Sequence, residues 1–224
     1  YASVVGLKFK HLIKNSEFKF YSIMIAGFSL FIMIELIFRL NYDIERAFRS
    51  SIFQVVSFIT TTGLFSDDAA KWPHVTWVVL AACMFFGGSS GSTSGGIKSI
   101  RGIMLLKVVK NEFRQILHPN AVLPMKIDGY NVQMSKRVTL LGFIGLYLFL
   151  AVICAFTMIA AGIDSTNSMT ITLSCLGNVG PTLGLEIGPT MSWNELPDFA
   201  KWISSFLMLV GRLELFSVLV LFTP

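Results

Sequence analysis

The sequence is poor in charge: only 14% of its 224 residues are Asp, Glu, Lys or Arg, whereas 54% are hydrophobic. A soluble domain carries about a quarter of charged residues. Residues 72–97 and 138–163 contain no Asp, Glu, Lys or Arg at all, and a helix needs about 20 mostly apolar residues to cross a bilayer. The composition therefore excludes an ordinary soluble domain and predicts an all-α membrane protein that crosses the lipid bilayer several times.

The sequence also has few residues that carry out covalent chemistry or bind metals. It contains three cysteines and three histidines, which stand apart from one another: Cys83, Cys154, Cys175, His11, His74 and His118. This spacing fits neither a disulfide framework nor a metal site. We therefore expect no enzyme activity and no covalently bound cofactor.

The charge that is present is mostly basic, with a formal net charge of +5. Lysines precede the first apolar segment, and a second group of basic residues fills the middle of the chain: Lys98, Arg101, Lys107, Lys110, Arg114, Lys126, Lys136 and Arg137. Basic residues favour the cytoplasmic side of membrane proteins. A basic linker can also bind nucleic acid, but the flanking spans already explain this charge, so we expect no nucleic acid partner.

Four segments follow from these patterns. We predict a cytoplasmic lead-in at residues 1–19, a span–pore loop–span repeat with a broken second span at 20–116, a cytoplasmic linker at 117–135, and a second such repeat at 136–224. The chain begins at Tyr1 and ends in an apolar stretch, so we expect it to be part of a longer protein.

Two matching motifs mark the pore loops. Ser57–Phe65 and Ser174–Thr182 align at a spacing of 117 residues, and each ends an apolar segment with a glycine, Gly63 or Gly180. If residues 50–66 crossed the membrane fully, the basic linker would lie outside. We therefore predict re-entrant helices at 50–66 and 168–175, the second followed by a filter strand at 176–180. One such glycine alone would suggest a helix cap, but two in matched repeats favour ion filters lined by backbone carbonyls.

A run of ten small residues interrupts the span that begins at Pro73. Such a run cannot form a stable helix interior, so we predict a break and a new helix from about residue 97 to 116. A phosphate-binding loop is excluded because Ile97 stands where its lysine is required. A helix-packing stripe formed by Gly87, Gly91 and Gly95 would explain only three of the ten residues. A flexible gate below the filter explains the whole run: Gly87, Gly88, Ser89, Ser90, Gly91, Ser92, Thr93, Ser94, Gly95 and Gly96.

Charged residues raise two further hypotheses. The last helix is expected to begin near Pro197 and to continue past Phe222, which places Arg212 about 22 Å along it. A charge at that depth is a functional candidate. The alternatives are snorkelling to the cytoplasm and an ion pair with Glu214, which is disfavoured because residues two apart on a helix do not face each other. On the outer side of the membrane, Asp67 and Asp68 either concentrate cations at the mouth of the pore or are ordinary solvated loop residues.

These motifs resemble the Trk/Ktr/HKT superfamily of potassium transporters. The likeness rests on Gly87–Lys98 after the helix that begins near Pro73, and on two filter sequences: Thr61, Thr62, Gly63 and Leu64, and Asn178, Val179, Gly180 and Pro181. It covers nearly the whole chain. The resemblance implies a pseudo-fourfold, potassium-channel-like pore of four span–pore–span repeats, of which this chain corresponds to the third and fourth.

The resemblance also implies a function, a site and partners. It implies potassium uptake across the bacterial cytoplasmic (inner) membrane, with the transported ion bound by the backbone carbonyls of Thr61, Thr62, Asn178 and Val179. It further implies that the glycine-rich loop obstructs the pore and contacts Arg212. Its implied partners are a second copy in a homodimer and a cytoplasmic nucleotide-binding regulatory subunit. Alternatives are a sodium-coupled symporter or sodium-conducting member of the superfamily, an alternating-access transporter, and a membrane scaffold without transport activity.

Overall fold

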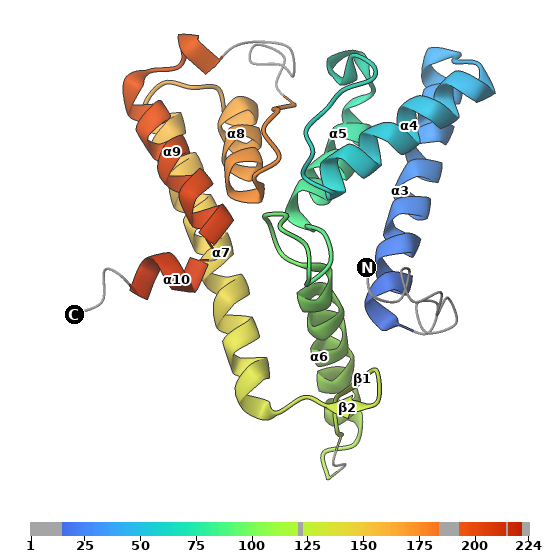
Figure 1. Ribbon diagram of the computed structural model, residues 1–224, viewed down its shortest axis with the longest axis vertical. Helices are drawn as coiled ribbons and strands as arrows, with labels where there is room; N and C mark the ends of the chain where they lie inside the picture. Colours follow the sequence, from blue (N-terminus) through green and yellow to red (C-terminus); the bar gives the residue numbers. More distant parts are fainter. Residues whose placement is uncertain (1–14, 121–122, 184–192, 214, 221–224) are drawn as a thin grey trace.

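The computed structural model describes residues 15–120, 123–183, 193–213 and 215–220, so most of the predicted lead-in at 1–19 lies outside the described residues. These parts are almost entirely helical (Figure 1). The elements in chain order are α3 (Ser16–Leu40), α4 (Ile44–Ile59), η1 (Ala69–Lys71), α5 (His74–Phe85), α6 (Ser99–Leu117), β1 (Lys126–Ile127), β2 (Tyr130–Asn131), α7 (Met134–Ala160), α8 (Ser165–Gly177), η2 (Trp193–Glu195), α9 (Asp198–Leu213) and α10 (Leu215–Leu219).

Two of the described helices are long and apolar enough to cross a membrane, α3 and α7, with mean hydropathy of 2.1 and 2.5 in their most apolar windows. The α3 helix begins where Asn15 accepts a hydrogen bond from the backbone N–H of Phe18, and it ends at Asn41 in a left-handed conformation, both of which are common ways to cap a helix. Helices are therefore present where the two predicted repeats, at 20–116 and 136–224, were expected to begin.

The two re-entrant helices are present but begin earlier than predicted. Helix α4 starts at Ile44 rather than at residue 50, and it lies obliquely against the upper half of α3 (Figure 1). Helix α8 starts at Ser165, because Asp164 accepts hydrogen bonds from the backbone N–H groups of Thr166 and Asn167. It continues to Gly177, so the predicted filter strand at 176–180 was wrong at its first two residues, which are helical.

The predicted break after α5 is confirmed. The 12 residues of α5 would extend about 18 Å, which is less than the roughly 30 Å hydrocarbon core of a bilayer. Pro73 is the cap before this helix rather than its first residue. The chain then loops through residues 86–98, and α6 runs on below the loop (Figure 1).

Two features of the chain differ from the prediction. The last helix is not continuous: α9 ends at Leu213, and α10 begins at Leu215 and points away from the axis of α9 (Figure 1). The predicted end near Phe222 lies outside the described residues. The linker, for which no structure was expected, contains a short antiparallel hairpin, β1–β2, whose turn residues Asp128 and Gly129 both have positive φ.

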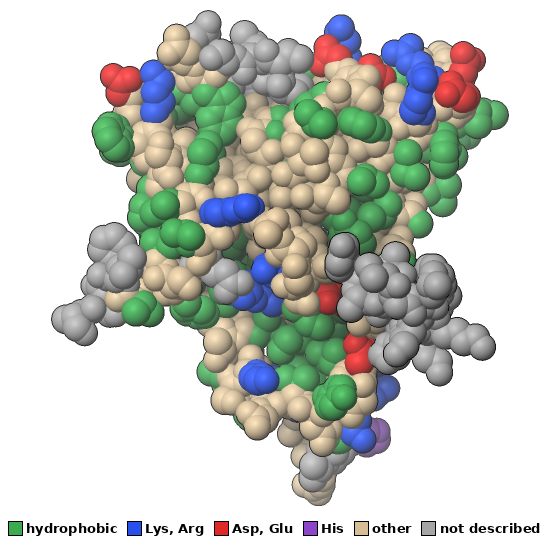
Figure 2. Space-filling view, viewed as in Figure 1, with side chains coloured by type: hydrophobic (Ala, Val, Ile, Leu, Met, Phe, Trp, Pro, Cys, Tyr) green, Lys and Arg blue, Asp and Glu red, His purple; other side chains and the backbone are tan. Residues whose placement is uncertain are grey.

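The buried side chains form two clusters, one in each repeat, and each cluster also contains residues from the other repeat. Ile97 of the first repeat packs in the second cluster, whereas Val179 and Leu183 of the second repeat pack in the first. Figure 2 shows hydrophobic side chains across the visible surface, with charged side chains at its upper edge, near its middle and in its lower part. Many large apolar side chains are exposed, as expected of a surface that meets lipid or further protein.

Trp77 offers a test of this packing. Its indole is 7% exposed and donates a hydrogen bond of 2.9 Å to the carbonyl oxygen of Ala69, which ties the outer turn η1 to α5. Trp77→Phe should lower the stability of the full-length protein by about 1 kcal/mol, measured as a lower midpoint of thermal unfolding. The control is Trp202→Phe, because Trp202 is 77% exposed. Equal shifts in the two variants would contradict the assignment.

Candidate functional site

The two predicted filter strands share one unusual backbone conformation. Thr61 and Asn178 both have a φ of 55°, in the left-handed region that few residues other than glycine adopt. Two residues later, Gly63 and Gly180 have φ values of 74° and 106°. The matched pairs lie 117 residues apart, as the two sequence motifs do. The strands that follow the two re-entrant helices therefore have positive φ at the same two matched positions.

One serine at the end of each re-entrant helix holds the strand that follows. The Ser57 hydroxyl donates a hydrogen bond of 2.7 Å to the carbonyl oxygen of Leu64 and accepts one of 2.8 Å from its N–H. The Ser174 hydroxyl accepts a bond of 3.0 Å from the N–H of Gly180. Sequence reasoning used these serines only to align the repeats and missed their role, although a serine at the same offset before both glycines was a usable signal.

The structure brings the two strands into contact. A methyl group added at Gly63 would overlap the carbonyl oxygen of Val179 and would crowd the ring of Pro181, whereas one added at Gly180 would meet nothing within 4 Å. Within the described residues, no cluster of His, Cys, Asp or Glu could hold a metal ion.

The glycine-rich loop lies directly against the end of the second re-entrant helix. A methyl group added at Gly95 would overlap the carbonyl oxygen of Gly177, and one added at Gly211 in α9 would overlap that of Leu176. The side-chain amide of Asn178 donates a 3.2 Å hydrogen bond to the carbonyl oxygen of Met208. Backbone therefore packs on backbone where the helix ends, and the C-terminal end of a helix carries partial negative charge.

The loop is closed at its neck by backbone hydrogen bonds. The N–H of Gly87 donates to Ile97, and the N–H of Ser99 donates to Gly88, at 2.9 and 3.1 Å. Inside the loop, the Ser94 hydroxyl accepts a 2.9 Å bond from the N–H of Gly88. Gly91 has nothing within 4 Å of an added methyl group. Among the described residues, Gly91 therefore makes no close packing contact of the kind that Gly87 and Gly95 make.

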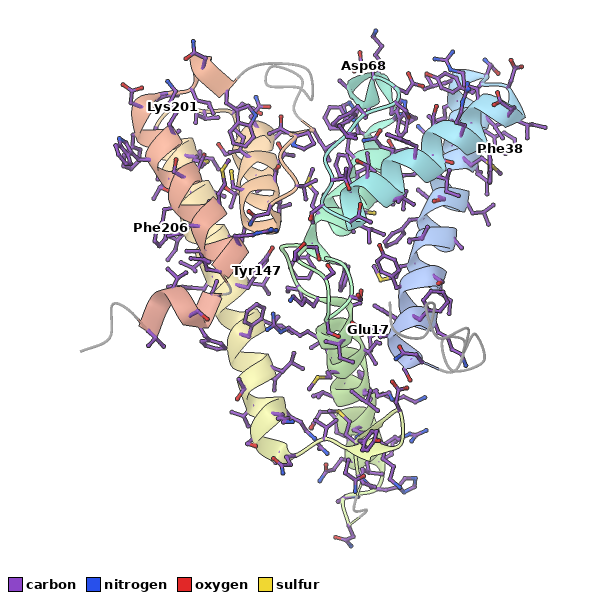
Figure 3. All side chains as sticks on the ribbon, viewed as in Figure 1. Glu17, Phe38, Asp68, Tyr147, Lys201 and Phe206 are labelled. Atoms are coloured by element: carbon purple, nitrogen blue, oxygen red, sulfur yellow. The ribbon has the colours of Figure 1, made fainter. Side chains whose placement is uncertain are left out.

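Two charged residues attach the loop to the helices around it. The Arg212 guanidinium donates a hydrogen bond to the carbonyl oxygen of Thr93, so the structure brings together the loop and the arginine that the sequence singled out. On the other side, the Glu17 carboxylate accepts hydrogen bonds from the N–H and the hydroxyl of Ser90. Figure 3 shows Glu17 at the lower end of α3. Sequence reasoning missed Glu17, and the alternative partner of Arg212, Glu214, lies outside the described residues.

A cavity of about 180 Å³ lies between the loop, α7 and α9. Three basic residues line it: Lys98, Arg101 and Arg212. Tyr147 lines it as well, and its ring meets that of Phe85 edge to face, with 5.5 Å between the ring centres. The described lining includes no acidic residue. Positive charge therefore gathers in the cavity between the loop and the helices around it.

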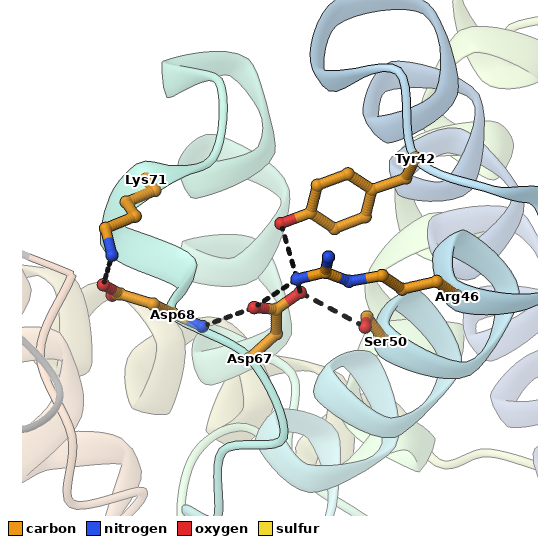
Figure 4. A network of polar contacts seen from close by, with 6 residues as sticks. All are labelled: Tyr42, Arg46, Ser50, Asp67, Asp68 and Lys71. Atoms are coloured by element: carbon orange, nitrogen blue, oxygen red, sulfur yellow. Dashed lines mark hydrogen bonds and ion pairs between the residues drawn. The ribbon is translucent and has the colours of Figure 1, made fainter.

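The outer end of the first filter strand is fixed by a polar network around Asp67 (Figure 4). Asp67 is 15% exposed, pairs with Arg46 at 3.4 Å, and accepts hydrogen bonds from Ser50 at 3.4 Å and from the N–H of Asp68 at 2.9 Å. The Arg46 guanidinium also lies over the ring of Tyr42, 4.1 Å from its centre. Burial, and then the charge of Asp67, raises the pKa of Tyr42.

Asp68 has local partners as well. Its side chain accepts a 3.2 Å hydrogen bond from the N–H of Ala70, which caps η1, and it pairs with Lys71 at 3.2 Å. Both aspartates therefore have structural partners. Of the two readings that the sequence left open for them, the contacts favour a local structural role over a cation-concentrating one.

Comparison with known proteins gives a consistent result. The family model TrkH, described as a cation transport protein, matches residues 16–224. The potassium uptake protein TrkH of Halomonas elongata is 35% identical over 214 residues, and TrkH of Escherichia coli K12 is 38% identical over 174 residues. These alignments cover 96% and 78% of this chain.

A solved structure has the same fold. The crystal structure of the potassium transporter TrkH from Vibrio parahaemolyticus matches 96% of this chain with a TM-score of 0.89 and 32% sequence identity. The chain covers only 46% of that structure, and 44% and 35% of the two relatives above. It therefore spans less than half the length of the proteins that it matches. The predicted fold class, a helical membrane protein with two span–pore loop–span repeats, is confirmed.

The serine contacts predict a specific loss of stability. Ser57→Ala removes both hydrogen bonds to the backbone of Leu64, which should cost about 1 kcal/mol. The expected result is a lower midpoint of thermal unfolding for the full-length protein. The control is Ser205→Ala, whose hydroxyl bonds only the carbonyl oxygen of Lys201 within its own helix. An unchanged midpoint for Ser57→Ala would show that the hydroxyl does not hold the strand.

Proposed function

Because the chain belongs to the TrkH family of cation transport proteins, we propose that it forms half of the ion path of a potassium uptake protein in the bacterial cytoplasmic membrane. The family transports cations, which confirms the prediction that the chain is not an enzyme. The observation that carries the proposal is the pair of filter strands, which share one conformation and touch at Gly63 and Val179. Several relatives are named as potassium uptake proteins.

The proposed ion site uses backbone oxygens. In this proposal the carbonyls of Thr61, Thr62, Asn178 and Val179 replace part of the hydration shell of a potassium ion, and the two missing repeats supply the remainder. Positive φ at the two glycines supports it, because such a conformation changes the direction of successive carbonyl groups. The strands thereby select the cation by geometry rather than by charge.

The loop at residues 87–96 is proposed to be the gate. It packs against the inner end of the second re-entrant helix, and Arg212 and Glu17 hold it from opposite sides. A loop that is held by a few hydrogen bonds to side chains can adopt two states. In the tied state these hydrogen bonds are formed, and in the released state they are broken. Opening would consist of releasing these contacts and withdrawing the loop, while the filter strands stay anchored on their serines.

The partner proposals rest on surfaces at the inner end. Four basic residues surround a hollow of about 270 Å³ between α6 and the hairpin: Lys107, Lys110, Arg114 and Lys126. We propose that a cytoplasmic nucleotide-binding subunit docks beside it and that the full-length protein is a homodimer. Both proposals predict that the full-length protein in detergent forms a complex larger than a single subunit.

Rubidium uptake tests the transport proposal. The full-length parent protein is expressed in a bacterium that lacks its own potassium uptake systems, and rubidium entry is measured with potassium, sodium or lithium as competitor. Competition by potassium but not by sodium supports the proposal. Uptake that is sodium-dominated, or that requires sodium, would replace it with the sodium-conducting or sodium-coupled alternative, and no uptake would favour the scaffold.

Gly63→Ala should damage selectivity in that assay. The added methyl group would overlap the carbonyl oxygen of Val179, and the positive φ disfavours any side chain. The expected result is a lower ratio of potassium to sodium competition, at equal protein abundance in the membrane. The control is Gly142→Ala in α7, where an added methyl group meets nothing within 4 Å. An unaltered ratio would show that this strand does not contribute to the selection of the cation.

Arg212→Ala should increase flux. It removes the hydrogen bond to Thr93 and a positive charge beneath the filter. A charged hydrogen bond contributes about 1.5–3 kcal/mol, so the released state should gain about tenfold or more in population. The measurement is the initial rate of rubidium uptake. The control is Arg49→Gln, at an exposed outer arginine that pairs only with Glu45. Flux that is unchanged or lower would argue against a gating contact.

A further inference from the structure

The first turn of α3 carries the residue that holds the glycine-rich loop from one side. The Glu17 carboxylate accepts a hydrogen bond of 2.5 Å from the N–H of Ser90 and one of 2.9 Å from its hydroxyl. Glu17 is only the second residue of α3, and the first N–H groups of a helix have no partners inside it. Helix ends fray when nothing holds them. The hold on the loop therefore depends on what fixes the start of α3.

A distant aspartate fixes that start. The N–H and the hydroxyl of Ser16, the first residue of α3, both donate to Oδ1 of Asp128, at 3.0 and 2.5 Å. A carboxylate at a helix N-terminus satisfies free N–H groups and interacts favourably with the helix dipole. Asn15 caps the same turn by accepting a hydrogen bond from the N–H of Phe18. Asp128 therefore acts as a second cap, which a segment 112 residues away supplies.

The hairpin β1–β2 holds Asp128 in place. Asp128 and Gly129 form the two-residue turn between the paired strands. Their φ values are 48° and 89°, as expected of an Asp-Gly turn in a tight hairpin. The hairpin is in turn fastened to α6, because the Lys107 ammonium donates a 2.6 Å hydrogen bond to the carbonyl oxygen of Lys126. The place of the Asp128 carboxylate is therefore set by the hairpin and by α6.

These contacts close a ring of attachments around the loop. The loop leads into α6, α6 carries the hairpin, the hairpin caps α3, and α3 holds the loop at Ser90. Helices α3 and α6 also pack closely, since a methyl group added at Gly102 would lie 3.4 Å from the ring of Phe20. Figure 1 shows the hairpin beside α6, below the start of α3. A shift of the hairpin away from α3 therefore has to break the bonds between Asp128 and Ser16 or move the first turn of α3.

We propose that Asp128 is a positioning residue for the glycine-rich loop. By capping α3 through Ser16, it presents the Glu17 carboxylate to the loop and so keeps the loop tied. Loss of the cap lets the first turn of α3 fray, and the loop then loses its attachment to α3 while its contact with Arg212 remains. This inference rests on the proposed gate only in its effect on flux.

The hairpin also lies at the surface where the cytoplasmic subunit is proposed to dock. The basic hollow of about 270 Å³ is lined by residues of α6 and of the hairpin. Its lining includes both partners of the hydrogen bond that fastens the two together, Lys107 and Lys126. A partner bound there contacts the residues that hold the hairpin. The cap at Asp128 thereby connects binding at the cytoplasmic face with release of the loop.

Asp128→Gly tests the positioning role in the full-length protein. Glycine adopts the positive φ of this turn without strain and removes the carboxylate. The initial rate of rubidium uptake should rise about threefold or more at equal membrane abundance, because charged hydrogen bonds that favour the tied loop are lost. The matched control is Asp43→Gly, since Asp43 is the N-cap residue of α4 and makes no side-chain hydrogen bond that caps it. An equal rise in both variants would overturn the positioning role.

A double variant separates positioning from a general loss of stability. Glu17→Ala removes the attachment itself and should raise the rate at least as much as Asp128→Gly. If Asp128 acts through Glu17, the double variant should be no faster than Glu17→Ala alone. Rates that multiply, or a rate that responds to Glu17→Ala but not to Asp128→Gly, would overturn the proposal. Ser16→Ala removes one of the two donors and replaces Asp128→Gly if that variant lowers membrane abundance, with a smaller rise expected.

Hydrogen exchange of the loop is a measurement that does not depend on transport. In the purified full-length protein, peptides that cover residues 86–98 should exchange their amide hydrogens faster in Asp128→Gly than in Asp43→Gly, because the N–H of Ser90 loses its acceptor. Equal exchange in the two variants would overturn the proposal. If the loop exchanges faster while neither Glu17→Ala nor Arg212→Ala changes rubidium uptake, the positioning role stands and the proposed gate fails.

Discussion

Backbone that leaves a helix within a membrane has to find its hydrogen-bond partners inside the protein. This constraint governs the three irregular segments at the centre of the chain. The two filter strands meet it through Ser57 and Ser174, whose hydroxyls accept from strand N–H groups. The loop between α5 and α6 meets it through its paired neck and through Ser94. The serine and threonine content of these segments follows from this need, because a hydroxyl both donates and accepts in little space.

A second feature of these irregular segments is that their backbones pack directly against one another. Gly63 meets Val179, Gly95 meets Gly177, and Gly211 meets Leu176, each at a distance that leaves no room for a methyl group. The filter strands, the loop and α9 therefore form one continuous packing unit. A displacement of the loop changes the surroundings of the last carbonyls of α8. The proposed gating at the loop and the proposed ion binding at the strands would therefore be physically coupled, even though they are assigned to different residues.

The sequence predicted those parts of the structure that depend on local composition. The long apolar helices, the break after Phe85 and the repeated motif at Ser57–Phe65 and Ser174–Thr182 were all visible, because long apolar runs, consecutive glycines and a repeated motif each have a direct local consequence. Element boundaries set by capping were missed: the Asp164 side chain begins α8 earlier than the apolar pattern does. The contact of Glu17 with Ser90 and the burial of Gln54 were missed as well, because pairing across 73 residues and burial of a single amide leave no periodic signal.

The two repeats show how one backbone conformation can rest on different side chains. The first repeat buries Gln54 in α4 and contains the charged pair of Arg46 and Asp67, whereas Ile171 lies at the equivalent place in the second repeat and Asn178 bonds to α9. Lining a filter with carbonyl oxygens leaves the side chains of the strand free to point elsewhere. The two strands therefore differ both in their own side chains and in the helices that support them. If both strands line the proposed filter with backbone carbonyl oxygens, these supports are where the two repeats would differ in how firmly each strand is held.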